Sequence, residues 1–222
     1  MRWVILLLVI LFSAPAAKLF QRAGTRMLST PALAAPQDEE ELRKTRLLSQ
    51  VQNALNIHSG SMVADVGTGD TLFHQPHIAR LIGPAGKLYC EDISQAALKT
   101  LAGKFEELGI RNVEMIVGKL DDPTLPEKMF DAILISNAYH EMAAYTSMLK
   151  HIRAALKPGG RLVVIESISD GTGASREAQA GKHELRPEFL YDDLENARFR
   201  VLDTVVLSKR EKTTRYLVIA SN

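Results

Sequence analysis

Short runs of apolar residues alternate with amphipathic segments along most of the chain after residue 60. A short apolar run bounded by turn residues is typical of a buried parallel strand, whereas apolar residues three and four apart are typical of a helix. The apolar runs predict strands at residues 62–66, 87–92, 113–117, 132–135, 161–165, 199–208 and 215–220. The amphipathic segments predict helices at residues 38–57, 72–82, 95–108, 143–156 and 187–196. Residues 167–182 are rich in glycine and serine and predict a mobile loop near the strand ends, in a position to act as a lid.

The stretch from Met62 to Thr71 combines a buried strand, a tight glycine turn and the start of a helix. Gly67 and Gly69 let the backbone come close to a ligand, and a helix N-terminus offers unpaired N–H groups. Asp65 lies at the carboxyl edge of the predicted sheet, where open α/β folds bind ligands. A carboxylate at this place favours a ligand that carries positive charge over a pyrophosphate.

Five segments, in this order and spacing, resemble the motifs of class I S-adenosylmethionine-dependent methyltransferases over about residues 61–167. They are Asp65-x-Gly67-x-Gly69, the strand that ends in Asp92, the strand and loop at residues 112–125, those at residues 130–141, and the turn and strand at residues 156–166. The resemblance implies an α/β fold with a Rossmann-like, doubly wound, mostly parallel seven-stranded sheet and an antiparallel C-terminal hairpin. It also implies S-adenosylmethionine as the cofactor.

The chain departs from the family pattern at three positions. Thr71 stands where a third glycine is usual, Lys119 stands where an aspartate is frequent, and Arg198 replaces a glycine before the C-terminal hairpin. Asp121, just beyond Lys119, is the alternative partner for the adenine amino group.

The resemblance implies a cofactor site built from the ends of four strands. Asp65 and the two glycines would hold the methionine end, and Asp92 would bind the ribose hydroxyls, with Glu91 as the alternative acid. The implied set of cofactor residues is Asp65, Gly67, Thr68, Gly69, Asp92, Ile93, Lys119, Leu120 and Asn137.

Tyr139-His140-Glu141 is the candidate acceptor-side cluster, because it follows the fourth strand. Methyl transfer from a sulfonium is an in-line displacement, so the protein mainly orients the reactants, and a base is needed only when the acceptor must lose a proton. His140 could be that base, oriented by Glu141, since the unperturbed pKa of histidine lies near neutrality. The alternative is that His140 and Glu141 only cap the next helix. His183 could reach the same cleft from beyond the glycine-rich loop, or lie at the surface.

Composition and charge narrow the possible functions. The chain of 222 residues suffices for one domain and an appendage, and its formal net charge of +1 provides no basic field for nucleic acid. The single cysteine, Cys90, excludes an internal disulfide and a multi-cysteine zinc site, and its position within a strand predicts a core residue. His74 and His77 have no further ligand at a recognisable spacing, so no metal site is predicted.

Residues 1–37 are predicted to be a signal peptide or membrane anchor with a linker, and residues 38–222 the methyltransferase domain. Residues 3–17 contain ten consecutive apolar residues followed by small ones, and a charged start precedes them, as in an exported or anchored protein. As a helix this segment would span about 22 Å, less than a hydrocarbon core of roughly 30 Å. If the segment is not cleaved, the basic residues after it favour a cytoplasmic face for the rest of the chain. A cytoplasmic protein that starts at Met27 is the remaining alternative.

The scaffold does not by itself select the methyl acceptor. The weak net charge and compact length favour a small-molecule or lipid-like acceptor and no nucleic-acid partner, and the sequence fixes no oligomeric state. A non-catalytic, membrane-tethered module on a degenerate methyltransferase fold is one alternative. An NAD-dependent oxidoreductase is another, although its Gly-x-Gly-x-x-Gly pattern fails at Leu72.

Overall fold

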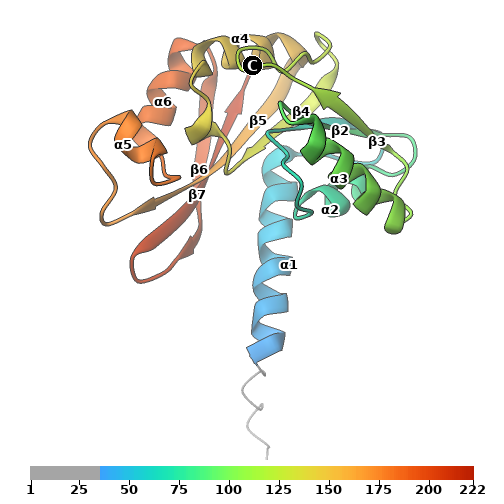
Figure 1. Ribbon diagram of the computed structural model, residues 1–222, viewed down its shortest axis with the longest axis horizontal. Helices are drawn as coiled ribbons and strands as arrows, with labels where there is room; N and C mark the ends of the chain where they lie inside the picture. The colour runs from blue at the N-terminus through green and yellow to red at the C-terminus, as the bar shows by residue number, and fades with distance from the viewer. Residues whose placement is uncertain (1–35) are drawn as a thin grey trace, which may run out of the picture. The chain divides into compact units, whose positions relative to one another are not determined.

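A single seven-stranded sheet, in the order β3-β2-β1-β4-β5-β7-β6, forms the centre of the computed structural model, which describes residues 36–222 (Figure 1). The strands are β1 (Met62–Val66), β2 (Lys87–Asp92), β3 (Val113–Val117), β4 (Phe130–Ser136), β5 (Leu156–Ser169), β6 (Arg200–Lys209) and β7 (Thr213–Ser221). The helices are α1 (Pro36–Leu55), α2 (Gln75–Ile82), α3 (Gln95–Glu107), α4 (Tyr145–Ala155), α5 (Arg176–Ala180) and α6 (Pro187–Asn196), with a 3₁₀ turn, η1 (Tyr139–Glu141).

The first five strands run parallel, and β7 runs antiparallel between β5 and β6. This confirms the expected doubly wound sheet with its antiparallel C-terminal hairpin. The chain builds outward from β1 to β3 and then crosses to β4 on the other side of β1. The carboxyl ends of β1 and β4 therefore meet where the strand order reverses, the place at which open α/β sheets bind ligands.

Two apolar clusters cover the two faces of the sheet. One contains Ile78, Leu101 and other residues of α1, α2 and α3, packed on β1, β2 and β4. The other contains Leu149, Leu190 and other residues of α4 and α6, packed on the opposite face (Figure 1). Because strand side chains alternate between faces, central strands covered on both sides must be apolar throughout, as β4 is from Ala132 to Ile135.

Several helix ends follow the local chemistry of the sequence. The Ser94 hydroxyl accepts a hydrogen bond from the Ala97 N–H at 3.2 Å and so caps α3. Pro187 begins α6, where its missing N–H costs nothing. Arg198 has a φ of 64°, in the left-handed region that favours glycine, at the position where the family pattern has glycine.

The glycine-rich segment at residues 167–182 is more ordered than its composition predicted. β5 continues to Ser169, because antiparallel pairing with β7 extends as far as the partner Thr213. Within the same segment α5 forms a short helix, capped by the Ser175 hydroxyl, which accepts from the Ala178 N–H. The prediction of one continuous loop was therefore wrong.

The predictions for residues 3–17 lie outside the described residues, so export or anchoring through them stays a prediction. Among residues 36–222, no helix has both the length and the apolar character needed to cross a membrane. Cys90 is completely buried, as its position within a strand predicted.

Candidate functional site

A cavity of about 290 Å³ lies at the carboxyl ends of β1 and β4, and we call it the switch-point cavity. Its walls include Asp65, Gly67, His74, Gln75, Asn137 and Arg215. Larger hollows along α3 and the edge strand β3 contain none of the predicted site residues. Of the predicted cofactor residues, Asp65, Gly67, Thr68 and Asn137 line this smaller hollow at the strand ends.

Asp65 is buried at the end of β1 and held by two donors. The Thr68 hydroxyl and the Gln75 side-chain amide each donate to the same carboxylate oxygen at 2.8 Å. Burial raises the pKa of Asp65 to about 6, although both hydrogen bonds favour the charged form. At neutral pH the carboxyl is therefore ionised and can accept hydrogen bonds from a cationic group.

The glycine turn after β1 requires glycine for two reasons. Gly67 and Gly69 have φ values of 70° and 64°, which disfavour residues with a Cβ. A Cβ on Gly67 would also lie 2.5 Å from the Cβ of Ala138, so this turn packs directly against the loop after β4. The Gly69 N–H donates to the Asp92 carboxylate at 2.9 Å, which fixes the turn against the end of β2.

The two acids at the end of β2 occupy different environments. Glu91 is buried, weakly bonded to the Gly67 N–H at 3.3 Å, and burial raises its pKa to about 8. Asp92 is partly exposed and accepts from the N–H groups of Gly69 and Ser94. Of the two, Asp92 is the acid whose oxygens remain accessible to a ligand, in the position that the family pattern assigns to ribose binding.

The sequence analysis assigned two cavity residues no place in the cofactor site, since it considered His74 only as a metal ligand and did not consider Arg215. Arg215, on β7, and His74, before α2, line the switch-point cavity, and the Arg215 Nε and His74 Nδ1 atoms are buried without a hydrogen-bond partner among the described residues. Burial lowers the pKa of His74 to about 3, so this imidazole is neutral. Burial also lowers the pKa of Arg215, but a guanidinium stays charged at neutral pH.

Asp65 and Arg215 therefore offer opposite charges to the same small cavity. A ligand with an ammonium and a carboxylate would match the charges of both residues. The Arg215 Nε, which has no hydrogen-bond partner among the described residues, is a buried donor for the ligand's carboxylate. The described residues thus fit the amino-acid end of S-adenosylmethionine. Arg215 could have been found only from the position of β7 beside β5, because nothing in its local sequence marks it.

The remaining implied cofactor residues lie around the rim of the sheet. Asn137 lines the cavity directly after β4, with a φ of 55° and its N–H donated to the Ile165 carbonyl at 2.9 Å. Ile93 and Leu120 are 56% and 74% exposed, unusual for large apolar side chains. Lys119 donates its N–H to the Asp122 carbonyl at 2.8 Å, which closes the turn after β3.

His140 lies on η1 and is paired with a carboxylate that the sequence analysis did not consider. Its Nδ1 lies 2.8 Å from Oε2 of Glu166, a fully buried residue on β5, and its backbone N–H donates to the other oxygen at 3.1 Å. Glu141, the expected orienting residue, is farther away, at 3.6 Å from Nε2. The hydrogen bonds to Glu166 raise the pKa of His140 against the opposing effect of burial.

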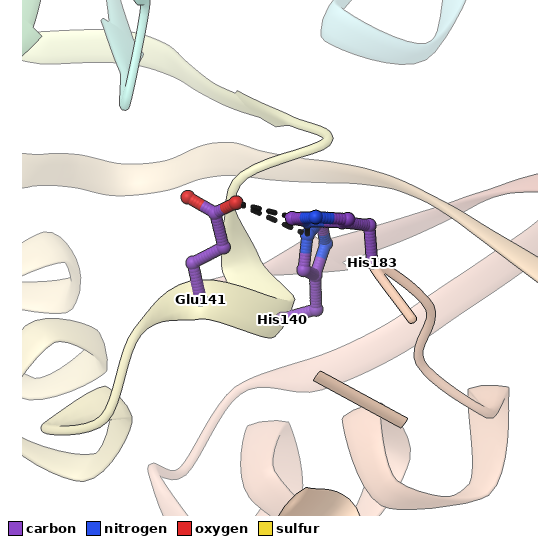
Figure 2. Close-up of side chains that lie close together, drawn as sticks. All are labelled: His140, Glu141 and His183. Atoms are coloured by element: carbon purple, nitrogen blue, oxygen red, sulfur yellow. Dashed lines mark hydrogen bonds and ion pairs between the residues drawn. The ribbon is translucent and has the colours of Figure 1, made fainter. Parts of the chain in front are cut away.

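His183 approaches His140 from the segment after α5, and Tyr139 points elsewhere. The Nδ1 of His183 lies 3.2 Å from the Nε2 of His140 and 3.1 Å from the Glu141 carboxylate (Figure 2). Tyr139 is completely buried, and its hydroxyl donates to the Asp193 carboxylate at 3.0 Å. The structure therefore brings His140, Glu141 and His183 together and places the Tyr139 hydroxyl in the contact with α6.

Comparison with known proteins finds methyltransferases over part of the chain. A family model described as a methyltransferase domain matches residues 63–160. The chain is 30% identical over 127 residues to a demethylmenaquinone methyltransferase of Geobacillus stearothermophilus, a match that covers 56% of this chain and 53% of the relative. It is 29% identical over 174 residues to the ubiquinone/menaquinone biosynthesis C-methyltransferase UbiE of Pseudomonas paraeruginosa, covering 73% of this chain and 65% of the relative. The chain spans about half the length of most of the curated relatives that it matches.

Solved structures agree with the observed fold. A SAM-dependent methyltransferase from Aquifex aeolicus aligns with a TM-score of 0.68 at 23% identity, over 85% of this chain and 99% of that one. Geranyl diphosphate C-methyltransferase from Streptomyces coelicolor A3(2) aligns with a TM-score of 0.66 at 14% identity, over 89% of each chain. Together with the glycine turn beside Asp65, these likenesses lead to one conclusion: residues 63–160 match a methyltransferase domain, and the described residues have the fold of the class I S-adenosylmethionine-dependent methyltransferases.

Proposed function

We propose that this chain is an S-adenosylmethionine-dependent methyltransferase that acts on a small, lipid-like acceptor such as a quinone-type ring compound. The observation that carries the proposal is the switch-point cavity, in which Asp65 and Arg215 offer opposite charges at the place where this superfamily holds the methionine end. The bound cofactor supplies an already activated methyl group. The chain itself has to bind the cofactor and the acceptor, orient them for the transfer and exclude water.

Each part of the site has a role in this proposal. Asp65 accepts hydrogen bonds from the ligand's ammonium, and Arg215 donates to its carboxylate. Asp92 binds the ribose hydroxyls, while Ile93 and Leu120 cover the adenine. Thr68 keeps the Asp65 carboxylate oriented through its 2.8 Å hydrogen bond, and the Gly67–Gly69 turn brings backbone N–H groups close to the ligand.

The acceptor class rests on two observations. The curated relatives in the sequence comparison are named as quinone-pathway methyltransferases, at about 30% identity. The net charge of +1 gives no field that would attract a polyanion. His140, oriented by Glu166, is the proposed base for an acceptor that must lose a proton.

Calorimetric titration of the full chain with S-adenosylmethionine and with its demethylated product tests the cofactor part. We expect both ligands to bind in the micromolar range and NAD, the control, not to bind. Methyl transfer to hydroxylated quinone precursors is then screened. Binding without any turnover would favour a non-catalytic module on the methyltransferase fold, for which Thr71, Lys119 and Arg198 are the relevant departures. A folded chain that binds neither ligand would overturn the proposal.

A further inference from the structure

Three ligand-forming side chains converge beside the acceptor side of the sheet. His140 and Glu141 come from η1, and His183 comes from the turn after α5 (Figure 2). Among residues 36–222, these three are the His, Cys, Asp or Glu side chains whose donor atoms lie close enough together to bind one metal ion. We propose that these three residues bind one divalent transition-metal ion of the Zn²⁺ type.

The distances between the donor atoms are close to those around a zinc ion. The edges of the triangle are 3.2 Å between the two histidine nitrogens, 3.1 Å from His183 to Glu141 and 3.6 Å from His140 to Glu141. Zinc binds nitrogen and carboxylate oxygen at roughly 2.0–2.2 Å, so tetrahedral geometry requires ligand–ligand edges of about 3.3–3.6 Å. The edge from His140 to Glu141 lies within this range and the two edges to His183 are slightly shorter, so a small shift of the exposed His183 side chain would complete one face of a coordination shell.

Glu166 supplies the outer-shell contact that a ligating histidine usually has. Its buried carboxylate lies 2.8 Å from the Nδ1 of His140, which favours the proton on Nδ1 and leaves the Nε2 lone pair directed at His183 and Glu141. A carboxylate hydrogen-bonded to Nδ1 also makes the Nε2 atom a stronger metal ligand. Because Glu166 is 0% exposed, this arrangement is built into the core of the sheet.

The coordination positions of the ion that these three residues leave open would face outward. His140 is almost fully buried, whereas the side chains of Glu141 and His183 are 61% and 75% exposed. Two histidines and one carboxylate are a common set for zinc with an open fourth position. Soft thiolate-binding ions are disfavoured, because the set contains no sulfur.

A bound ion would join two segments that are 42 residues apart in the sequence. His183 has a φ of 55°, uncommon for a residue with a side chain, and this backbone conformation turns its imidazole toward η1. The ion would hold the segment around α5 against the turn that follows β4. It would also take the Nε2 lone pair, so His140 cannot act as a free base in the metal-bound chain.

The decisive experiment measures metal binding alone, so it does not depend on methyl transfer. The untagged full chain is stripped with a chelator and titrated calorimetrically with Zn²⁺, and with Co²⁺ to record its visible absorption. One ion per chain and a tetrahedral or five-coordinate Co²⁺ spectrum are expected. Fe²⁺ and Mn²⁺ are titrated in parallel, and tighter binding of either than of Zn²⁺ would contradict a zinc-type site.

Variants identify the ligands. His183→Ala removes an exposed imidazole and Glu141→Gln replaces an exposed carboxylate with an amide, so both variants should fold, and each is expected to weaken Zn²⁺ binding by roughly 100-fold. His151→Ala, which removes a half-exposed histidine outside the cluster, is the control and should bind as the unaltered chain does. Unchanged affinity in His183→Ala, or no Zn²⁺ binding by the folded unaltered chain, overturns the proposal. Either result leaves the proposed methyl transfer standing, because cofactor binding is measured separately.

Discussion

At the scale of single residues, the switch-point cavity depends on groups whose charge is set by burial. Asp65 has a pKa of about 6, so it is ionised at neutral pH but close to the point at which it would lose its charge. Its two donors, Thr68 and Gln75, bind the same oxygen, Oδ2, so the other carboxylate oxygen can accept from a ligand. The sequence predicted Asp65 from its motif but could not show these partners.

Replacing Asp65 by asparagine tests its charge, because the side chain keeps its size. We expect Asp65→Asn to weaken S-adenosylmethionine binding by roughly 10- to 100-fold, since a charge-assisted hydrogen bond contributes about 1.5–3 kcal/mol. Calorimetric titration measures the change, and Asp70→Asn, at an exposed acid in the same turn, is the control. An affinity that is unchanged in Asp65→Asn would remove this residue from the cofactor site.

Glu91 predicts an unusual pH dependence of stability. Burial raises its pKa in the folded state to about 8, from an ordinary value near 4.5, so the folded chain holds a proton that the unfolded chain has released between these values. Its contribution to stability is complete below about pH 4.5 and is lost as the pH rises through 8, with a slope of at most about 1.4 kcal/mol per pH unit.

The free energy of unfolding in urea, measured from pH 5 to pH 8, checks this expectation. Glu91→Gln should make the free energy of unfolding less dependent on pH, because glutamine has no proton to lose. The control Glu107→Gln, on the exposed side of α3, should keep the pH dependence of the unaltered chain. Asp65 acts in the same direction, with a pKa of about 6, so some slope should remain in Glu91→Gln. A profile as steep as that of the unaltered chain would show that Glu91 is not protonated in the fold.

At the scale of secondary-structure elements, the periodicity of the sequence located most of the strands. β1 and β3 have the predicted bounds, because short apolar runs between glycine and polar residues leave little freedom. The prediction failed at β5 and α5. There the strand continues through a polar segment because β7 pairs with it, and α5 is stabilised by contacts with η1 and α6 that its own sequence does not show.

Arg176 is the main tether of α5. Its guanidinium lies 2.5 Å from the Asp193 carboxylate on α6 and stacks 3.6 Å from the centre of the Tyr145 ring. Asp193 also accepts from the buried Tyr139 hydroxyl, so losing the arginine would leave a largely buried carboxylate without its counter-charge.

We therefore expect Arg176→Ala to lower the free energy of unfolding by roughly 2 kcal/mol. Denaturant unfolding measures the change, and protection of the α5 amides from hydrogen exchange should fall with it. Arg210→Ala, in the exposed turn between β6 and β7, is the matched control. Equal stability of the two variants would mean that the ion pair contributes nothing net to folding.

At the scale of the whole molecule, the cofactor should stabilise the entire domain, since its site joins β1, β4 and β7. A ligand present at 100 times its Kd stabilises the folded state by about 2.7 kcal/mol. For a chain of this size we expect Tm to rise by roughly 5–10 °C. Differential scanning calorimetry with and without S-adenosylmethionine measures the shift, which should be much smaller in Asp65→Asn at the same concentration. A rise of the same size with NAD would contradict the proposed specificity.

The parallel sheet, the glycine turn at Gly67 and Gly69, and the acids at the ends of β1 and β2 follow from the sequence alone. These features are local, because apolar runs specify buried strands and glycine specifies backbone conformations within a few residues. Which distant side chains come together depends on the tertiary structure. The antiparallel placement of β7 brings Arg215 into the cavity that Asp65 lines, and Glu166 and His183 contact His140 across 26 and 43 residues. The pairing of strands and the packing of η1 against the segment after α5 create these contacts, and no spacing along the chain encodes them.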